Sequence, residues 1–171
     1  MKRLSALLLT LAITLAAHSQ EYLKLMSYNI KNATGMDGIT NCQRIANIIL
    51  RETPDVVAIQ EIDSATIRSE QRYILGEIAE RTQIIETGVE ELVNARKVAN
   101  KYGIGILSRE EPLAVHRFPL PGREERRALL MAEFADYIFC CSHFSLNRED
   151  RLASVELIKE IATLHSHGKP F

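Results

Sequence analysis

The sequence predicts a mixed fold of the α/β (α+β) class, in which helices alternate with the strands of a mixed sheet. Between residues 22 and 63 an apolar strand, a loop, an amphipathic helix and a second apolar strand follow one another, which is a βαβ-like unit. The 171 residues are 46% hydrophobic and 25% charged, as is typical of one globular domain. A net charge of −1 gives no extended nucleic-acid footprint, which favours chemistry at a local site.

Residues 1–19 are predicted to be a secretory signal peptide. Lys2 and Arg3 form a positive start, an apolar stretch covers 4–17, and Ala17-His18-Ser19 resembles a cleavage signal. The apolar stretch, about fourteen residues, is short for a membrane-spanning helix, so a retained anchor is the less favoured alternative. We therefore expect an exported protein, in the periplasm, secreted or at the outer surface, whose domain covers 20–171 and spans no membrane.

The central feature of the chain is an apolar run that follows Pro54 and ends at Gln60 and Glu61. The run has no polar alternation, which predicts a strand covered on both faces. By two-residue periodicity Glu61 shares a face with Val57 and Ile59. A carboxylate buried there needs a cation, a metal, several donors or a proton. The alternative is a strand that simply emerges into solvent at Glu61.

The other elements are expected from hydrophobic periodicity and from turn residues. Further strands are predicted at 22–30, 83–86, 102–108, 112–118, 128–134 and 136–142. Helices are predicted after a Thr40–Gln43 capping box, over 69–81, and after an Asn147 cap. The inward face of the last helix is predicted to be Leu152, Val155, Ile158 and Ile161. Residues 87–101 show no clear pattern, and two glycines at 103 and 105 indicate tight packing.

Three cysteines, Cys42, Cys140 and Cys141, are predicted to be small buried hydrophobic residues. An odd count without regular spacing is neither a disulfide framework nor a zinc motif. Export still permits a disulfide between Cys42 and one of the adjacent pair.

Three predicted strands each finish at a polar residue able to do chemistry: Asn29, Glu61 and His143. Ligand sites in open α/β sheets collect at the carboxyl ends of strands. A lone histidine there is more often a packed residue than a catalyst, but three such residues together favour metal-assisted phosphoester hydrolysis. Mg²⁺ needs oxygen ligands and keeps several waters, so one or two carboxylates suffice to hold it.

Five short motifs occur in the order found in the endonuclease/exonuclease/phosphatase superfamily, which the chain resembles. They are Met-Ser-Tyr-Asn-Ile at 26–30, Pro-Asp-Val-Val-Ala-Ile-Gln-Glu at 54–61, Gly-Ile-Gly-Ile-Leu-Ser-Arg at 103–109, Arg-Arg-Ala-Leu-Leu at 126–130 and Ser-His-Phe at 142–144. The resemblance implies a four-layer α/β/β/α sandwich of two packed mixed sheets, with the site at one end. It also implies a metal-dependent phosphodiesterase or phosphomonoesterase, monomeric when complete.

The resemblance assigns roles to individual residues. It implies that Glu61 is the metal ligand for Mg²⁺ or Mn²⁺, and that Asn29 and His143 are catalytic. Arg126 or Arg127 corresponds to a position near the phosphate-ester substrate.

The chain departs from the pattern of similar proteins at its end. They continue into an apolar strand that ends Gly-Asp-x-Asn and later reach Ser-Asp-His, whereas this chain stops at Gly168-Lys169-Pro170-Phe171. We therefore expect the C-terminal strands to be missing and the chain to be an incomplete, inactive part of the hydrolase. The alternative is a non-catalytic fragment or an anion-binding module that uses the Arg123–Arg127 loop.

Overall fold

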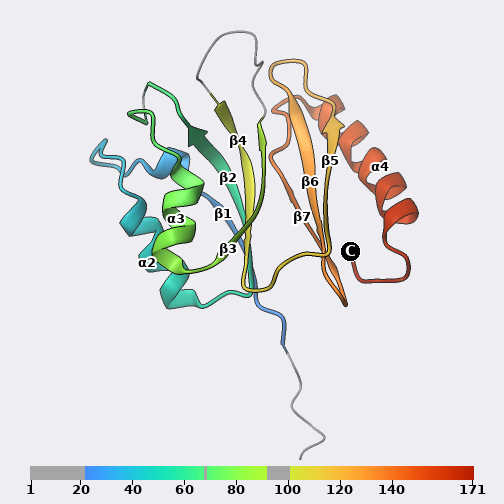
Figure 1. The fold of residues 1–171 in the computed structure, drawn as a ribbon. Helices are drawn as coiled ribbons and strands as arrows, with labels where there is room; N and C mark the ends of the chain where they lie inside the picture. The colour runs from blue at the N-terminus through green and yellow to red at the C-terminus, as the bar shows by residue number, and fades with distance from the viewer. Residues whose placement is uncertain (1–21, 68, 92–100) are drawn as a thin grey trace, which may run out of the picture.

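The computed structural model describes residues 22–67, 69–91 and 101–171; the predicted signal peptide lies outside them. Two sheets pack face to face with helices on both outer faces, so the predicted four-layer α/β/β/α sandwich is confirmed (Figure 1). The first half of the chain contributes β1 (Leu25–Asn29), η1 (Lys31–Ala33), α2 (Cys42–Glu52), β2 (Val56–Ser64), α3 (Ile74–Thr82), β3 (Ile85–Glu91) and β4 (Lys101–Ser108). The second half contributes β5 (Ala114–Leu120), β6 (Arg127–Glu133), β7 (Ile138–Ser142) and α4 (Arg148–His165).

The first sheet is mixed, with strand order β1-β2-β4-β3. Strands β1 and β2 run parallel because α2 connects them, and β4 pairs antiparallel with both β2 and β3. The described strands of the second sheet, in the order β5-β6-β7, are all antiparallel. At the centre of the first sheet, a Cβ on Gly105 would lie 2.6 Å from Leu75 Cδ2 and 2.8 Å from Ile62 Cδ1, which confirms tight packing at this glycine.

Three apolar layers hold the sandwich together. Helices α2 and α3 cover the outer face of the first sheet, the two sheets bury apolar side chains between them, and α4 covers the second sheet. Strand β2 serves two of these layers, since Val57 and Ile59 point to the helices while Val56 and Ala58 point to the second sheet. This explains the absence of polar alternation in its sequence. No helix among the described residues is long and apolar enough to cross a membrane.

The predicted inward face of α4 is partly wrong. Leu152 and Val155 are 52% and 39% exposed, whereas Ser154 is fully buried. Asp150 is also buried, because its carboxylate accepts hydrogen bonds from Arg123 N and Ser145 Oγ. These polar contacts turn the helix so that the stripe through 150, 154, 157 and 161 faces the sheet.

Two predicted helix starts also differ from the structure. The cap of α2 is Asn41 rather than Thr40, because the Asn41 side chain accepts hydrogen bonds from the first-turn N–H groups. Helix α3 begins at Ile74 rather than 69. Thr66 and Ser69 bond each other and Thr66 bonds the buried Asp63, which holds the preceding residues in turns.

The cysteines are free, as predicted for small packed side chains. Cys42 and Cys141 are each 1% exposed, and Cys140 is partly buried under α4. The adjacent pair points to opposite faces of β7, which excludes a bond between them. Burial raises the pKa of the Cys141 thiol to about 12, so it stays protonated at neutral pH.

Candidate active site

Glu61 lies in a β-bulge rather than at the end of its strand. Strand β2 continues to Ser64, but its pairing with β4 skips a residue between Gln60 and Ile62. Glu61 is the inserted residue and has φ 57°, the left-handed region. Ile62 therefore takes the core position beside Ile59, and the prediction that Glu61 shares that face is wrong. The bulge turns the carboxylate, which is 25% exposed, out of the core.

Asn29 ends β1 and orients Glu61. Its Nδ2 donates to Glu61 Oε1 at 2.7 Å, while its Oδ1 accepts from Lys31 N at 3.1 Å. Both polar atoms of the Asn29 amide therefore have partners, and its orientation is set. Only one oxygen of Glu61 is used by this contact.

His143 follows β7 in the second sheet, and its Nε2 lies 3.8 Å from Glu61 Oε1. Burial lowers the pKa of His143, and the Arg127 charge lowers it further, while Glu61 and Glu125 oppose the shift. The imidazole is therefore neutral at pH 7, with one nitrogen that donates and one that accepts.

A contact between the sheets, which the sequence did not indicate, sets the place of His143 relative to Glu61. Gln60 Nε2 donates to Cys141 Sγ at 3.6 Å, and Cys141 Sγ donates to Ile59 O at 3.5 Å. Both residues are buried, and each lies one or two positions from a predicted site residue. Asn29, Glu61 and His143, predicted from three separate strand ends, are thus brought together at one end of the sandwich.

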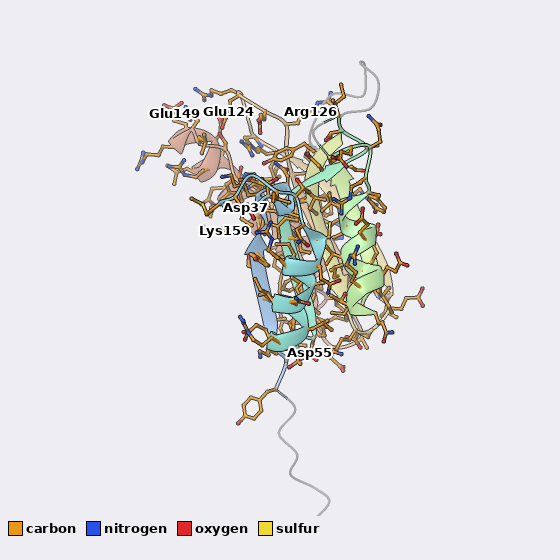
Figure 2. All side chains as sticks on the ribbon, turned by 90° about the vertical axis from the view of Figure 1, so that its left-hand side faces the viewer. Asp37, Asp55, Glu124, Arg126, Glu149 and Lys159 are labelled. Atoms are coloured by element: carbon orange, nitrogen blue, oxygen red, sulfur yellow. The ribbon has the colours of Figure 1, made fainter. Side chains whose placement is uncertain are left out.

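The two candidate substrate-binding arginines have different surroundings. Arg126 is exposed at one end of the molecule, where Glu124 and Glu149 also lie (Figure 2). Arg127 is only 4% exposed at its side chain; its Nη2 lies 3.2 Å from Glu125 Oε2, and its Nη1 donates to His143 O at 3.4 Å. This burial does not support the prediction that Arg127 binds substrate. It places Arg127 behind His143.

The residues present fit a weakly held hard cation. No group of three or more His, Cys, Asp or Glu side chains that could hold a metal is found within 22–67, 69–91 and 101–171. Asn29 bonds one carboxylate oxygen of Glu61, which leaves the other oxygen available to a cation, and the side chain is partly open to solvent. Mg²⁺ retains several waters and often binds through one or two carboxylates plus substrate phosphates. A single carboxylate of this kind suits Mg²⁺ or Mn²⁺ better than a structural zinc.

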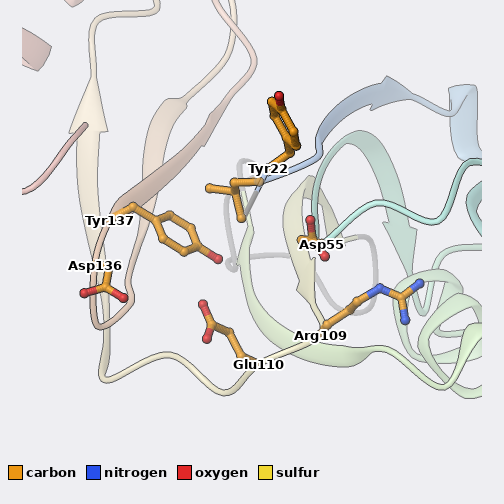
Figure 3. Close-up of a pocket in the computed structure, with 7 residues that line it drawn as sticks. Tyr22, Asp55, Arg109, Glu110, Asp136 and Tyr137 are labelled. Carbon is orange, nitrogen blue, oxygen red and sulfur yellow. The ribbon is translucent and has the colours of Figure 1, made fainter. Parts of the chain in front are cut away.

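A separate cavity of about 450 Å³ lies away from this site. Asp55, which lines it, is at the opposite end of the molecule from Glu124 and Arg126 (Figure 2). Figure 3 shows Glu110 and Asp136 beside the ring of Tyr137 in this cavity. It contains none of the predicted site residues.

The bulge predicts an unusual order of stability for two variants that both remove the carboxylate. Glycine adopts a left-handed φ freely, whereas alanine in that region costs about 1–2 kcal/mol. We expect Glu61→Gly to be more stable than Glu61→Ala by about 1 kcal/mol in urea unfolding. At an ordinary strand position the order is reversed, so Ala114→Gly in β5, compared with the wild type that already has alanine there, is the control. A less stable glycine variant at 61 would show that the bulge is relaxed.

The fold is shared with solved structures, although no family model and no curated protein sequence matches the chain. An endonuclease/exonuclease/phosphatase from Beutenbergia cavernae is 22% identical with a TM-score of 0.65, over 81% of this chain and 43% of that one. A mannosyl-6-phosphatase from Bacteroides thetaiotaomicron is 18% identical with a TM-score of 0.63, over 86% and 61%. D. rerio TDP2 complexed with a single-strand DNA product is 16% identical with a TM-score of 0.59, over 86% and 57%.

These likenesses concern the architecture. The chain spans 43%, 61% and 57% of the lengths of these three structures. The resemblance in the sequence motifs and the likeness in three dimensions agree on one architecture. The chain has the endonuclease/exonuclease/phosphatase fold.

Proposed function

We propose that the protein is a metal-dependent phosphoesterase that hydrolyses a phosphodiester or phosphomonoester. The observation that carries this proposal is the meeting of Asn29, Glu61 and His143 from three strands and both sheets. Solved structures with the same fold include a phosphatase and TDP2 with a DNA product. The chemistry of the three side chains, an oriented carboxylate beside a neutral imidazole, suits phosphoryl transfer.

Each residue of the site is assigned a separate role in metal and substrate binding. Glu61 is proposed to hold Mg²⁺ or Mn²⁺, and Asn29 fixes the carboxylate so that its second oxygen is free. Bound there, the ion supplies polarisation of the phosphoryl group and offsets its negative charge. His143, neutral because of its lowered pKa, donates a hydrogen bond from its N–H to a phosphoryl oxygen, and its other nitrogen is proposed to accept a proton during the reaction. Arg126, exposed at the same end, is the proposed substrate cation.

The predicted signal peptide supports an exported protein, which acts on a phosphate ester outside the cytoplasm. The alternative function, anion binding by the Arg123–Arg127 loop, has less support from the ion pairs. Arg123 is engaged by Glu149 and Asp150, and Arg127 is buried. Arg126 is the one arginine of this loop that remains free within the described part of the chain.

Metal dependence tests the proposal directly. The protein encoded by its complete reading frame is incubated with bis(p-nitrophenyl) phosphate or p-nitrophenyl phosphate, with Mg²⁺, with Mn²⁺ or with EDTA. We expect hydrolysis only with metal, and we expect Mn²⁺ binding, followed by water proton relaxation, to strengthen when inorganic phosphate is added. Hydrolysis that persists in EDTA, or no Mn²⁺ binding, would overturn the proposal.

A further inference from the structure

We propose that the β5–β6 loop, residues 121–126, is a brace that positions His143, and that Glu124 is its principal positioning residue. This inference rests on the proposed function, in which His143 touches the phosphoryl group. His143 lies just beyond the last paired residue of β7, Ser142. No sheet ladder among the described strands fixes its backbone, so other contacts must do so.

Glu124 makes the first connection. Its Oε1 accepts from Ser145 Oγ and from Leu146 N, both at 2.6 Å, and its Oε2 lies 2.8 Å from the same hydroxyl. One carboxylate thus holds the backbone and the side chain of the segment that begins two residues after His143. The Ser145 hydroxyl and the Leu146 N–H lower the pKa of Glu124 to about 2, so it is ionised and accepts both bonds at neutral pH.

Arg127 makes the second connection, from the first residue of β6. Its Nη1 donates to the carbonyl of His143 itself at 3.4 Å, and its Nη2 lies 3.2 Å from Glu125 Oε2 and 3.6 Å from Glu124 Oε1. The Arg127 side chain is 4% exposed, and this burial leaves the cation little freedom to move; its Nε has no hydrogen-bond partner among the described residues. The loop and the adjoining first residue of β6 therefore contact the segment at three residues, His143, Ser145 and Leu146.

The loop is itself anchored on α4. Arg123 N donates to Asp150 Oδ2 at 3.0 Å, and Arg123 Nε donates to Asp150 Oδ1 at 3.2 Å. Asp150 also lies 3.2 Å from Ser145 Oγ, which joins loop, segment and helix. The turn admits no side chain at Gly122, where a Cβ would lie 2.2 Å from Glu125 O. Glu124 and Asp150 therefore connect this loop to the segment that follows His143, and the loop is more than a solvated charged surface.

Two variants of Glu124 and one matched control test the brace. Glu124→Ala removes every acceptor, and Glu124→Gln keeps one oxygen for Leu146 N. Glu149→Gln is the control, because Glu149 is 75% exposed and pairs with Arg123 without touching the 143–146 segment. For each we measure kcat and KM for the phosphate ester, Mn²⁺ affinity, the NMR signals of the His143 ring, and amide hydrogen exchange at Leu146.

We expect Glu124→Ala to lower kcat by about 10- to 100-fold, because a displacement of about 1 Å at a catalytic group has an effect of that order. Mn²⁺ affinity stays unchanged, since Glu61 and its contact with Asn29 lie outside the loop. The His143 ring signals shift and Leu146 exchanges faster, Glu124→Gln is intermediate, and the control matches wild type. A Ser145→Ala change has a smaller effect in Glu124→Ala than in the wild type, because the hydrogen bond between Ser145 and Glu124 is already lost there.

Wild-type kcat and His143 ring signals in both Glu124 variants would overturn the brace. If Glu124→Ala does not fold, Glu124→Gln decides by the same measurements. If the wild-type protein shows no metal-dependent hydrolysis, the proposed function fails. The His143 ring signals and the Leu146 exchange rate then still test whether the loop positions His143. Shifts in both signals then support the brace as a positioning device, and unchanged signals reject it.

Discussion

Replacing Glu61 with glutamine is expected to lower kcat by about 100-fold or more, and to abolish Mn²⁺ binding. A bound metal ion contributes several kcal/mol to transition-state stabilisation, and about 1.4 kcal/mol corresponds to a factor of ten in rate. Glutamine keeps the size of the side chain and one oxygen, but it loses the charge that holds the cation. The measurement combines steady-state kinetics with water proton relaxation of Mn²⁺ titrations.

The matched control for this change is Glu160→Gln on the exposed side of α4. It removes one carboxylate from the surface without touching the site, so it separates a local effect from a change in net charge. Unchanged Mn²⁺ binding in Glu61→Gln would place the metal elsewhere and would remove Glu61 from the mechanism. Asn29→Ala is expected to weaken Mn²⁺ binding less, because it loosens the carboxylate but leaves its charge in place.

Replacing His143 with glutamine is expected to lower kcat by about 10²–10⁴-fold, the range over which a positioned proton-transfer group acts. Glutamine still offers an N–H to the phosphoryl oxygen but cannot exchange a proton near neutral pH. His167→Gln is the control, since His167 is exposed beyond the C-terminal end of α4. A loss of less than tenfold would restrict His143 to hydrogen bonding.

The pH profile gives an independent check of the same residue. Burial lowers the pKa of His143 below 6.5, so the neutral imidazole is present above that value and is lost as the pH falls through the lowered pKa. We expect kcat/KM to rise with pH along an acidic limb below 6.5 and then to level off. We expect this acidic limb to disappear in the His143→Gln variant. If the limb persists in that variant, it reports the titration of a group other than His143.

The sequence predicted most elements because their local signals agree with their tertiary roles. The apolar run of β2 is buried on both faces, as its lack of alternation indicated. Asn147 caps α4 as predicted, through hydrogen bonds from Glu149 N and Asp150 N. The candidate site residues were predicted because each follows an apolar run, and the carboxyl ends of strands meet at one edge.

Other features depend on contacts between residues far apart in the chain. The bulge at Glu61 inserts a residue against β4, some forty positions later, and periodicity within one strand cannot show it. The inward face of α4 is set by Asp150 and Ser154, because Asp150 bonds the β5–β6 loop. A hydrophobic pattern places Leu152 and Val155 on that face, since it takes no account of hydrogen bonds made by buried polar side chains.

The sequence by itself therefore predicted the α/β class and the three residue types of the candidate site, because apolar runs and the residues that follow them are local properties. The two-sheet architecture followed from the resemblance of its motifs to the endonuclease/exonuclease/phosphatase superfamily. Only the tertiary structure decided which carboxylate oxygen of Glu61 accepts the hydrogen bond from Asn29, and how far the His143 ring lies from that oxygen. It also decided that Arg127 lies behind His143. The physical reason is that orientation, burial and pKa depend on neighbours supplied by other strands. The order of residues along the chain does not reveal those neighbours, because they are brought together only when the sheets and helices pack.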